Sequence, residues 1–203
     1  MPTNDSASYA AVILAGGQGT RMHNQDKGLV QYHQQSLVSI VLSRLQTQLS
    51  NILIVANRNL AQYQALGCPV ISDWPQPQQT PTYDGPLRGI CRAMEYFQTH
   101  SPLAQWLLLA PCDAPNYPTD LLHTYQKILA HSEAHYDCLL PHDSNRMQPL
   151  FALLRLSCRP QLELALSKSE LSLRRVLPQL NCCDIALPQE YFVNINRPEQ
   201  LHA

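Results

Sequence analysis

Short apolar segments divide the first half of the chain and predict buried β-strands. They lie at residues 10–14, 51–56, 69–72 and 105–110. Continuous apolar segments of this length are typical of strands that are covered on both faces of a sheet. The first of them runs directly into a glycine-rich turn, which begins at Ala15.

The stretches between these strands have the spacing of amphipathic helices. Ser36 is a suitable N-cap for a helix whose apolar residues recur at every fourth position, namely Leu37, Val41, Leu45 and Leu49. A short helix is expected over 59–66, ended by Gly67. Pro86 marks the first turn of another helix, whose buried face contains Leu87, Ile90, Cys91, Met94 and Phe97.

The second half of the chain has a weaker pattern. A helix is predicted over 121–129, followed by strands at 136–140 and 149–154, helical stretches near 160–166 and 170–180, a strand at 183–187 and a further apolar segment at 192–196. Residues 74–84 hold three prolines and three glutamines, and they are expected to form a long loop.

The order of these elements predicts an α/β fold. Strands that alternate with helices build a three-layer, doubly wound, mostly parallel sheet of the Rossmann-like kind. We expect a flexible lead at 1–8 and a single domain at 9–203. Ligands of such sheets bind at the carboxyl ends of the strands. The loop after the first strand, Asp73 and residues 111–115 are therefore expected to share one site.

Composition and charge exclude some classes of function. The chain has 14 Lys and Arg residues against 15 Asp and Glu, so it lacks the positive field that attracts nucleic acids or anionic membranes. The longest apolar run, 9–15, is far below the roughly 18 residues of a membrane span. The seven cysteines form no C-x-x-C pair, which favours free thiols in a reducing compartment. We therefore expect a cytoplasmic protein without nucleic-acid or membrane partners.

The glycine-rich loop after the first strand carries two cations. It reads LAGGQGTRM over 14–22, and Asp26-Lys27-Gly28-Leu29 follows shortly after. Small residues leave backbone N–H groups free to converge on an anion, while Arg21 and Lys27 supply the charge that a polyphosphate needs. The loop lacks the Gly-Lys-Ser/Thr ending of a Walker motif, and Met22 does not fit the dinucleotide fingerprint. A phosphate-binding loop and a tight turn with two solvated cations are the two interpretations.

Together these motifs resemble a known enzyme family. The first loop with Asp-Lys-Gly-Leu is similar to nucleotidyltransferases, and most closely to molybdenum cofactor guanylyltransferases. Later segments resemble that family's blocks in the same order, namely GPLRG at 85–89, PCDAP at 111–115, QPLFAL at 148–153 and VNINRPE at 193–199. The likeness covers residues 10–201. The first block is shared with sugar-phosphate and cytidylyl transferases, whereas its combination with Asp-Lys-Gly-Leu and Pro-Cys-Asp is more specific.

The resemblance implies roles for individual residues. The nucleotide would lie against the loop formed by Leu14, Ala15, Gly16 and Gly17, with Lys27 and Arg21 on its phosphates. Asp73 would contact the nucleotide, and Asp113 would ligate Mg²⁺; Arg21, Lys27 and Asp113 would form the catalytic set. The alternatives are a helix cap for Asp113 and a solvated loop carboxylate for Asp73.

Val55 departs from the family pattern, and Arg146 lies outside the blocks that resemble it. Related chains often carry Asn where this one has Val55, so a nucleotide contact expected there has to come from elsewhere, and Asn57 is the neighbouring candidate. Arg146 precedes the QPLFAL block. It either meets an anionic second substrate or is a solvated loop arginine.

The resemblance also implies the reaction and its partners. The enzyme would transfer GMP from GTP to molybdenum-bearing molybdopterin with loss of pyrophosphate, using a nucleotide-binding half at 9–115 and an acceptor-binding half at 116–203. Proteins of cofactor synthesis or insertion and molybdoenzyme chaperones would be its further partners. Two alternatives are a CTP- or UTP-dependent transferase acting on a sugar or alcohol phosphate, and a non-catalytic nucleotide-binding adaptor.

Overall fold

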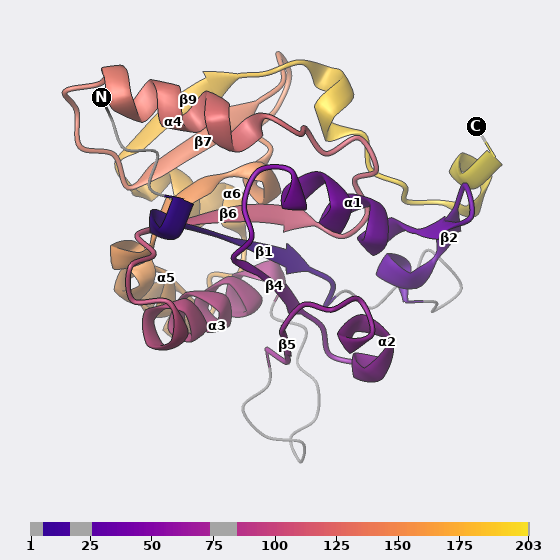
Figure 1. Cartoon of the computed structure of the whole chain (residues 1–203). Helices are drawn as coiled ribbons and strands as arrows, with labels where there is room; N and C mark the ends of the chain where they lie inside the picture. Colours follow the sequence, from indigo (N-terminus) through magenta and orange to yellow (C-terminus); the bar gives the residue numbers. More distant parts are fainter. Residues whose placement is uncertain (1–5, 17–25, 74–84, 203) are drawn as a thin grey trace.

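The chain forms a seven-stranded sheet in the order β5-β4-β1-β6-β8-β7-β9 (Figure 1). A computed structural model describes residues 6–16, 26–73 and 85–202. Neighbouring strands pair in parallel except at β8, which is antiparallel to both β6 and β7. The strands are β1 (Tyr9–Leu14), β4 (Ile52–Val55), β5 (Val70–Ile71), β6 (Trp106–Pro111), β7 (Cys138–His142), β8 (Leu153–Arg155) and β9 (Cys182–Ala186).

Helices cover both faces of this sheet, which confirms the predicted three-layer fold. One face packs against α1 (Leu37–Gln46), α2 (Leu60–Gln64) and α4 (Leu121–His131), and the other against α3 (Gly85–His100), α5 (Arg159–Ser167) and α6 (Leu173–Val176). Side chains alternate along a strand, so in β1 Ala11 and Ile13 join the first apolar core while Ala10 and Val12 join the second.

Local signals of the sequence explain several element boundaries. Ser36 caps α1 as predicted, because its side-chain oxygen accepts a hydrogen bond from the backbone N–H of Ser39 at 3.3 Å. Gly67 follows α2 with a φ of 81°, a conformation that favours glycine. β1, β4 and β6 are buried along almost their whole length, as expected of continuous apolar segments.

Two predicted elements differ in the structure. The strand expected at 149–154 begins instead with a 3₁₀ turn, η4 (Pro149–Phe151), and only Leu153–Arg155 pairs in the sheet, because a proline cannot donate to a strand ladder. The helix expected at 170–180 is limited to α6 and a 3₁₀ turn, η6 (Leu177–Gln179). The apolar segment noted at 192–196 forms no strand. The loop predicted at 74–84 and residues 1–5 of the predicted lead lie outside the described residues, while Ser6–Ser8 form the 3₁₀ turn η1.

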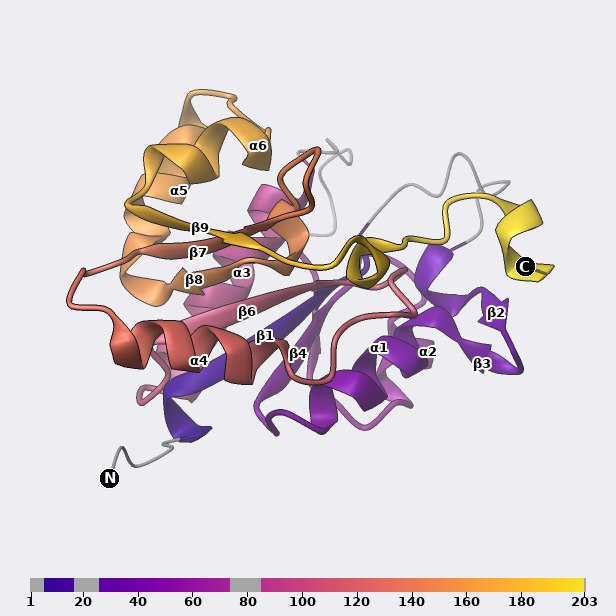
Figure 2. The same ribbon diagram turned by 90° about the horizontal axis from the view of Figure 1, so that it is seen from above.

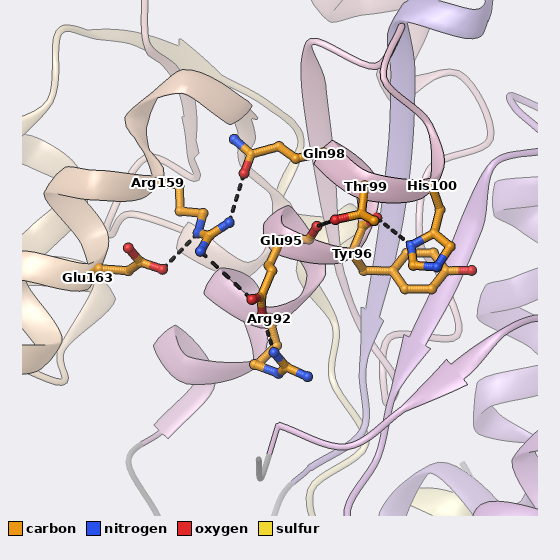
Figure 3. A network of polar contacts seen from close by, with 8 residues as sticks. All are labelled: Arg92, Glu95, Tyr96, Gln98, Thr99, His100, Arg159 and Glu163. Carbon is orange, nitrogen blue, oxygen red and sulfur yellow. Dashed lines mark hydrogen bonds and ion pairs between the residues drawn. The ribbon is translucent and has the colours of Figure 1, made fainter.

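A polar network joins α3 to α5 on the outer side of the second core (Figure 3). Arg159 of α5 donates hydrogen bonds to Gln98 Oε1 of α3 at 2.8 Å and to Glu163 Oε1 at 2.7 Å. Its guanidinium also lies 4.0 Å from Glu95 Oε1. Pairs as exposed as these contribute little energy individually. The apolar core is therefore the main contact that holds these two helices together.

The chain after β9 returns across the sheet toward the N-terminal half. In both views it runs from the β9 side past β6 to the small hairpin of β2 (Gln31–Tyr32) and β3 (Gln35–Ser36) (Figures 1 and 2). Ile195 is buried there against Val30 and Leu37, in a third small apolar cluster. The short turns η7 (Gln189–Phe192) and η8 (Pro198–His202) flank this crossing. No helix among the described residues has the length and apolar character that a membrane span requires.

Candidate active site

The carboxyl ends of four parallel strands meet at one edge of the sheet, as the element order predicted. Ala15 N, directly after β1, donates to Val55 O at 2.8 Å, and Ala56 N, directly after β4, donates to Ile71 O at 3.0 Å. On the other side, Cys112 N donates to Leu14 O at 3.3 Å. The loops after β1, β4, β5 and β6 therefore start side by side.

Lys27 and Asp113 meet at this edge. Lys27 begins the 3₁₀ turn η3 (Lys27–Leu29), and its ammonium group pairs with the Asp113 carboxylate. The same nitrogen donates a hydrogen bond to Asn196 Oδ1 at 2.7 Å. The backbone of the returning C-terminal segment is fixed at this point, because Ile195 N donates to Asp113 O at 2.9 Å. Three segments that are distant in the sequence thus converge on one ammonium group.

The partial burial of this pair determines what it can do. The Lys27 side chain is 21% exposed and that of Asp113 is 10% exposed. Interactions between charges are stronger in such surroundings than in bulk water, because the effective dielectric constant is lower. The ammonium group is suited to bind a phosphate oxygen, and the carboxylate is suited to bind a cation. Asp113 does not cap the following helix, because α4 has Asp120 at its N-cap, and the Asp113 carboxylate pairs with Lys27 instead.

A second cluster lies where the loops after β1, β4 and β5 meet. Asn57 Oδ1 accepts hydrogen bonds from Ser72 Oγ at 3.0 Å and from Asp73 N at 3.2 Å. These two donors leave the Asn57 amide nitrogen directed at Gly16, where an added Cβ would lie 3.1 Å from Nδ2 and 3.4 Å from Asp73 Oδ2. A side chain at position 16 would press on both groups. Glycine at position 16 therefore lets Asn57 and Asp73 approach the backbone of the loop closely.

The Val55 side chain lies away from this cluster. It belongs to the second apolar core, and its Cγ1 lies 3.3 Å from the position of a Cβ added to Gly89 in α3. Val55 is thus a packing residue in this chain. Asn57, two residues later, is the amide side chain that contacts the loop of Asp73.

Beside Lys27, Asp26 is the centre of a further polar cluster. Its carboxylate accepts hydrogen bonds from Tyr63 Oη at 2.5 Å and Asn59 Nδ2 at 3.1 Å, and it lies 3.8 Å from Arg58 Nε. Asp26 is only 9% exposed, and Tyr63 is fully buried. Burial above all, together with the neighbouring Cys112 and Asp26, raises the pKa of Tyr63 well above its ordinary value. The hydroxyl therefore stays protonated and donates.

The turn after β7 lies at the same edge of the sheet. Asp143 Oδ1 accepts from the backbone N–H groups of Asn145 at 2.8 Å and Arg146 at 2.9 Å, and Oδ2 accepts from Gln148 Nε2 at 2.6 Å. These bonds, that of Asn145 first, lower the pKa of Asp143. Arg146 is exposed at the tip of the turn, and both interpretations of this residue remain predictions.

The structure brings most of the predicted residues together. Lys27 contacts Asp113, Gly16 lies beside Asp73, and Leu14 and Ala15 connect β1 to the neighbouring loops. Gly17 and Arg21 lie outside the described residues. Sequence reasoning missed three side chains of the site, namely Asn196, Asp26 and Tyr63. The family-like VNINRPE block contains the first and Asp-Lys-Gly-Leu the second, whereas nothing in the sequence pointed to Tyr63.

Comparisons with known proteins identify the family. A model of the MobA-like NTP transferase domain matches residues 11–183. The chain belongs to the MobA-like NTP transferase family. It is 35% identical to the molybdenum cofactor guanylyltransferase of Vibrio cholerae over 99% of this chain and 93% of that protein. It is 37% identical to the molybdenum cofactor guanylyltransferase of Serratia proteamaculans, over 93% of this chain and 89% of the relative.

Solved structures place the fold of this MobA-like NTP transferase among nucleotidyltransferases. Molybdopterin-guanine dinucleotide biosynthesis protein A from Archaeoglobus fulgidus matches with a TM-score of 0.71 at 22% identity, covering 96% of this chain and 95% of that one. The 4-diphosphocytidyl-2C-methyl-D-erythritol synthase from Anaerococcus prevotii matches with a TM-score of 0.68 at 10% identity, covering 98% and 94%. At these identities the likeness concerns the fold.

Proposed function

We propose that this protein transfers GMP from GTP to the terminal phosphate of molybdenum-bearing molybdopterin and releases pyrophosphate. Its relatives at 35% and 37% identity are molybdenum cofactor guanylyltransferases. The observation that carries the proposal is the contact between Lys27 and Asp113 at the carboxyl edge of β1 and β6. It supplies a site for an anion and a site for a cation next to the glycine-rich loop, which is what a metal-bound triphosphate requires.

In this proposal the nucleotide lies along the loop after β1. The backbone at Leu14, Ala15, Gly16 and Gly17 holds the nucleoside, and Asp73 contacts it from the loop after β5. The close approach of Asn57 and Asp73 to Gly16 supports this placement, because it brings their polar groups to the loop that would hold the nucleotide. The phosphates then extend toward Lys27, with Arg21 as the second cation of the loop.

The residues fit the Mg²⁺ ion that we propose as cofactor. Among the described residues no group of three or more His, Cys, Asp or Glu side chains is close enough to hold a metal. Magnesium nevertheless suits this edge, because it commonly takes only one or two carboxylates and completes its shell with water and phosphate oxygens. Asp113 is the carboxylate that would hold it, and a bound Mg²⁺ would supply charge neutralisation at the phosphates.

The chemistry requires positioning more than a strong base. A phosphate monoester is already ionised near pH 7, so its oxygen can attack the α-phosphorus of GTP directly. The new bond joins the acceptor oxygen to the α-phosphorus, and the bond between this phosphorus and the bridging oxygen to the β-phosphate breaks. Negative charge grows on the departing pyrophosphate, where Lys27 and Arg21 stabilise it.

The acceptor would enter from the second half of the sheet. We propose that residues 9–115 bind the nucleotide and residues 116–203 bind the pterin, with proteins of cofactor synthesis or insertion and molybdoenzyme chaperones as further partners. All seven cysteines have free thiols, which supports a location in the reducing cytoplasm.

Release of pyrophosphate from a panel of nucleotides tests this proposal. Purified protein is mixed with Mg²⁺, molybdenum-bearing molybdopterin and GTP, CTP, UTP or ATP, with sugar phosphates as alternative acceptors. We expect release with GTP and molybdopterin at a rate at least tenfold above any other pair. A preference for CTP or UTP with a sugar phosphate would assign a different transferase, and GTP binding without turnover would indicate a nucleotide-binding adaptor.

A further inference from the structure

The segment that carries Lys27 is held from one side by a single buried tyrosine. Tyr63 lies in α2, the helix between β4 and β5, and its hydroxyl donates to Asp26 at 2.5 Å. Asp26 is the residue directly before Lys27, and its carbonyl oxygen accepts the N–H of Leu29 at 3.0 Å, which closes the η3 turn. The tyrosine thus contacts the turn whose first residue is the phosphate-binding lysine.

The packing around the hydrogen bond between Tyr63 and Asp26 is tight. A Cβ added to Gly28 would lie 2.6 Å from the Tyr63 hydroxyl oxygen and 3.4 Å from Cys112 Cβ. Real side-chain carbons do not approach an oxygen so closely, so only glycine at this position lets the hydroxyl pass over the turn to Asp26. Asn59, which precedes α2 with a left-handed φ of 53°, provides a second donor to the same carboxylate. Two donors from the α2 region therefore hold one turn.

The ammonium group of Lys27 depends on this turn for its position. Its two partners, Asp113 and Asn196, come from the opposite side of the site. They contact only the end of a long, flexible side chain, whereas Asp26 fixes the backbone from which that side chain starts. A catalytic group misplaced by about 1 Å loses much of its effect.

We propose that Asp26 and Tyr63 are positioning residues for Lys27, with Asn59 as a supporting donor. They act through the backbone of the η3 turn and do not touch the nucleotide. The inference rests on the proposed function in one respect, namely that Lys27 binds the phosphates. Removal of the Tyr63 hydroxyl is expected to displace Lys27 and weaken both binding of GTP and catalysis, while binding of the acceptor is unchanged.

A double-mutant cycle tests this role. Tyr63→Phe is compared in the wild-type chain and in the Lys27→Ala variant, with Tyr125→Phe as matched control. Tyr125 is also fully buried, and its hydroxyl donates to Phe151 O at 2.9 Å. We expect Tyr63→Phe to lower kcat/KM for GTP roughly tenfold in the wild-type chain and less than twofold in the Lys27→Ala background. Tyr125→Phe is expected to change kcat/KM less than twofold in the wild-type chain. Equal losses in both backgrounds would show that Tyr63 acts without Lys27.

Amide hydrogen exchange gives a second measurement that needs no activity. The N–H groups of Leu29 and Val30 close the turn, and in Tyr63→Phe they are expected to exchange about tenfold faster than in the wild type or in Tyr125→Phe. Unchanged exchange would overturn the proposed anchor even if the enzyme is a guanylyltransferase. Faster exchange in a protein that does not use GTP would support the anchor and refute the proposed function. Should Tyr63→Phe fail to fold, Asn59→Gly keeps the left-handed backbone and removes the second donor, with the same expected direction in both measurements.

Discussion

Substitution of Gly28 by alanine tests the packing at the centre of the site. The added methyl group would lie 2.6 Å from Tyr63 Oη and 3.3 Å from Tyr63 Cε1. The ring is fully buried and its hydroxyl is bound to Asp26, so moving it away would disturb its buried neighbours and strain this hydrogen bond. Overpacking of this kind typically costs about 1–3 kcal/mol. We expect Gly28→Ala to lower the free energy of unfolding by about 2 kcal/mol, which corresponds to a decrease in Tm of about 4–8 °C in a chain of this size.

Urea denaturation of five variants, three single and two double, measures this effect and its cause. Tyr63→Phe removes the oxygen that the new methyl group would contact most closely. The loss in the double variant Gly28→Ala/Tyr63→Phe should therefore be smaller than the sum of the single losses by about 1 kcal/mol or more. The losses of Gly28→Ala and Tyr125→Phe should add in their double variant, because the Tyr125 hydroxyl donates to Phe151 O and not to Asp26. Strictly additive losses for Gly28→Ala and Tyr63→Phe would refute the packing described for this turn. A Gly28→Ala variant with the free energy of unfolding of the wild type would refute it as well.

Three further predictions concern other groups. Asp113→Ala is expected to keep the fold and to lower turnover about 10²-fold or more. The control Asp184→Ala, at an exposed carboxylate of β9, should leave turnover within twofold of the wild type. Near wild-type turnover of Asp113→Ala at saturating Mg²⁺ would remove Asp113 from its role. The lowered pKa of Asp143 means that its stabilising effect is present above its ordinary value of 3.8 and is lost as the pH falls through the folded-state value. The difference in unfolding free energy between wild type and Asp143→Asn should thus shrink below pH 3.8, and a constant difference between pH 7 and pH 3 would contradict the shift. Burial raises the pKa values of Cys91 and Cys158 to about 12, so iodoacetamide at pH 8 should label these thiols only after unfolding. Rapid labelling of either thiol in the native protein, measured by mass spectrometry, would contradict this prediction.

The parts of the fold that depend on local pattern were predictable. Continuous apolar segments marked β1, β4 and β6, and the repeat after Ser36 marked α1 together with its cap. The segment at 149–154 was misinterpreted because its apolar composition suits a strand while Pro149 prevents pairing at its start. The antiparallel insertion of β8 between β6 and β7 has no local signal, since it depends on long-range pairing.

The parts of the site that could be predicted are the charged side chains that belong to one short motif. The cation of Asp-Lys-Gly-Leu and the acid of Pro-Cys-Asp pointed to Lys27 and Asp113, and the parallel order brought them together. Asn196 reaches the same ammonium group only because Ile195 anchors the returning segment, 169 positions along the chain from Lys27. Tyr63 looks in the sequence like any aromatic residue of a helix. Its role follows from the hydrogen bond to Asp26, which only the folded structure shows.

Crystals grown with GTP and Mg²⁺ test the central claim most directly. That claim is that the loop after β1, Lys27 and Asp113 face a common triphosphate. We predict density for the nucleotide along Leu14–Gly16, with its phosphates beside the Lys27 ammonium group and a metal ion on the Asp113 carboxylate. Nucleotide density at another edge of the sheet, or phosphates that contact neither Lys27 nor a metal held by Asp113, would contradict the account.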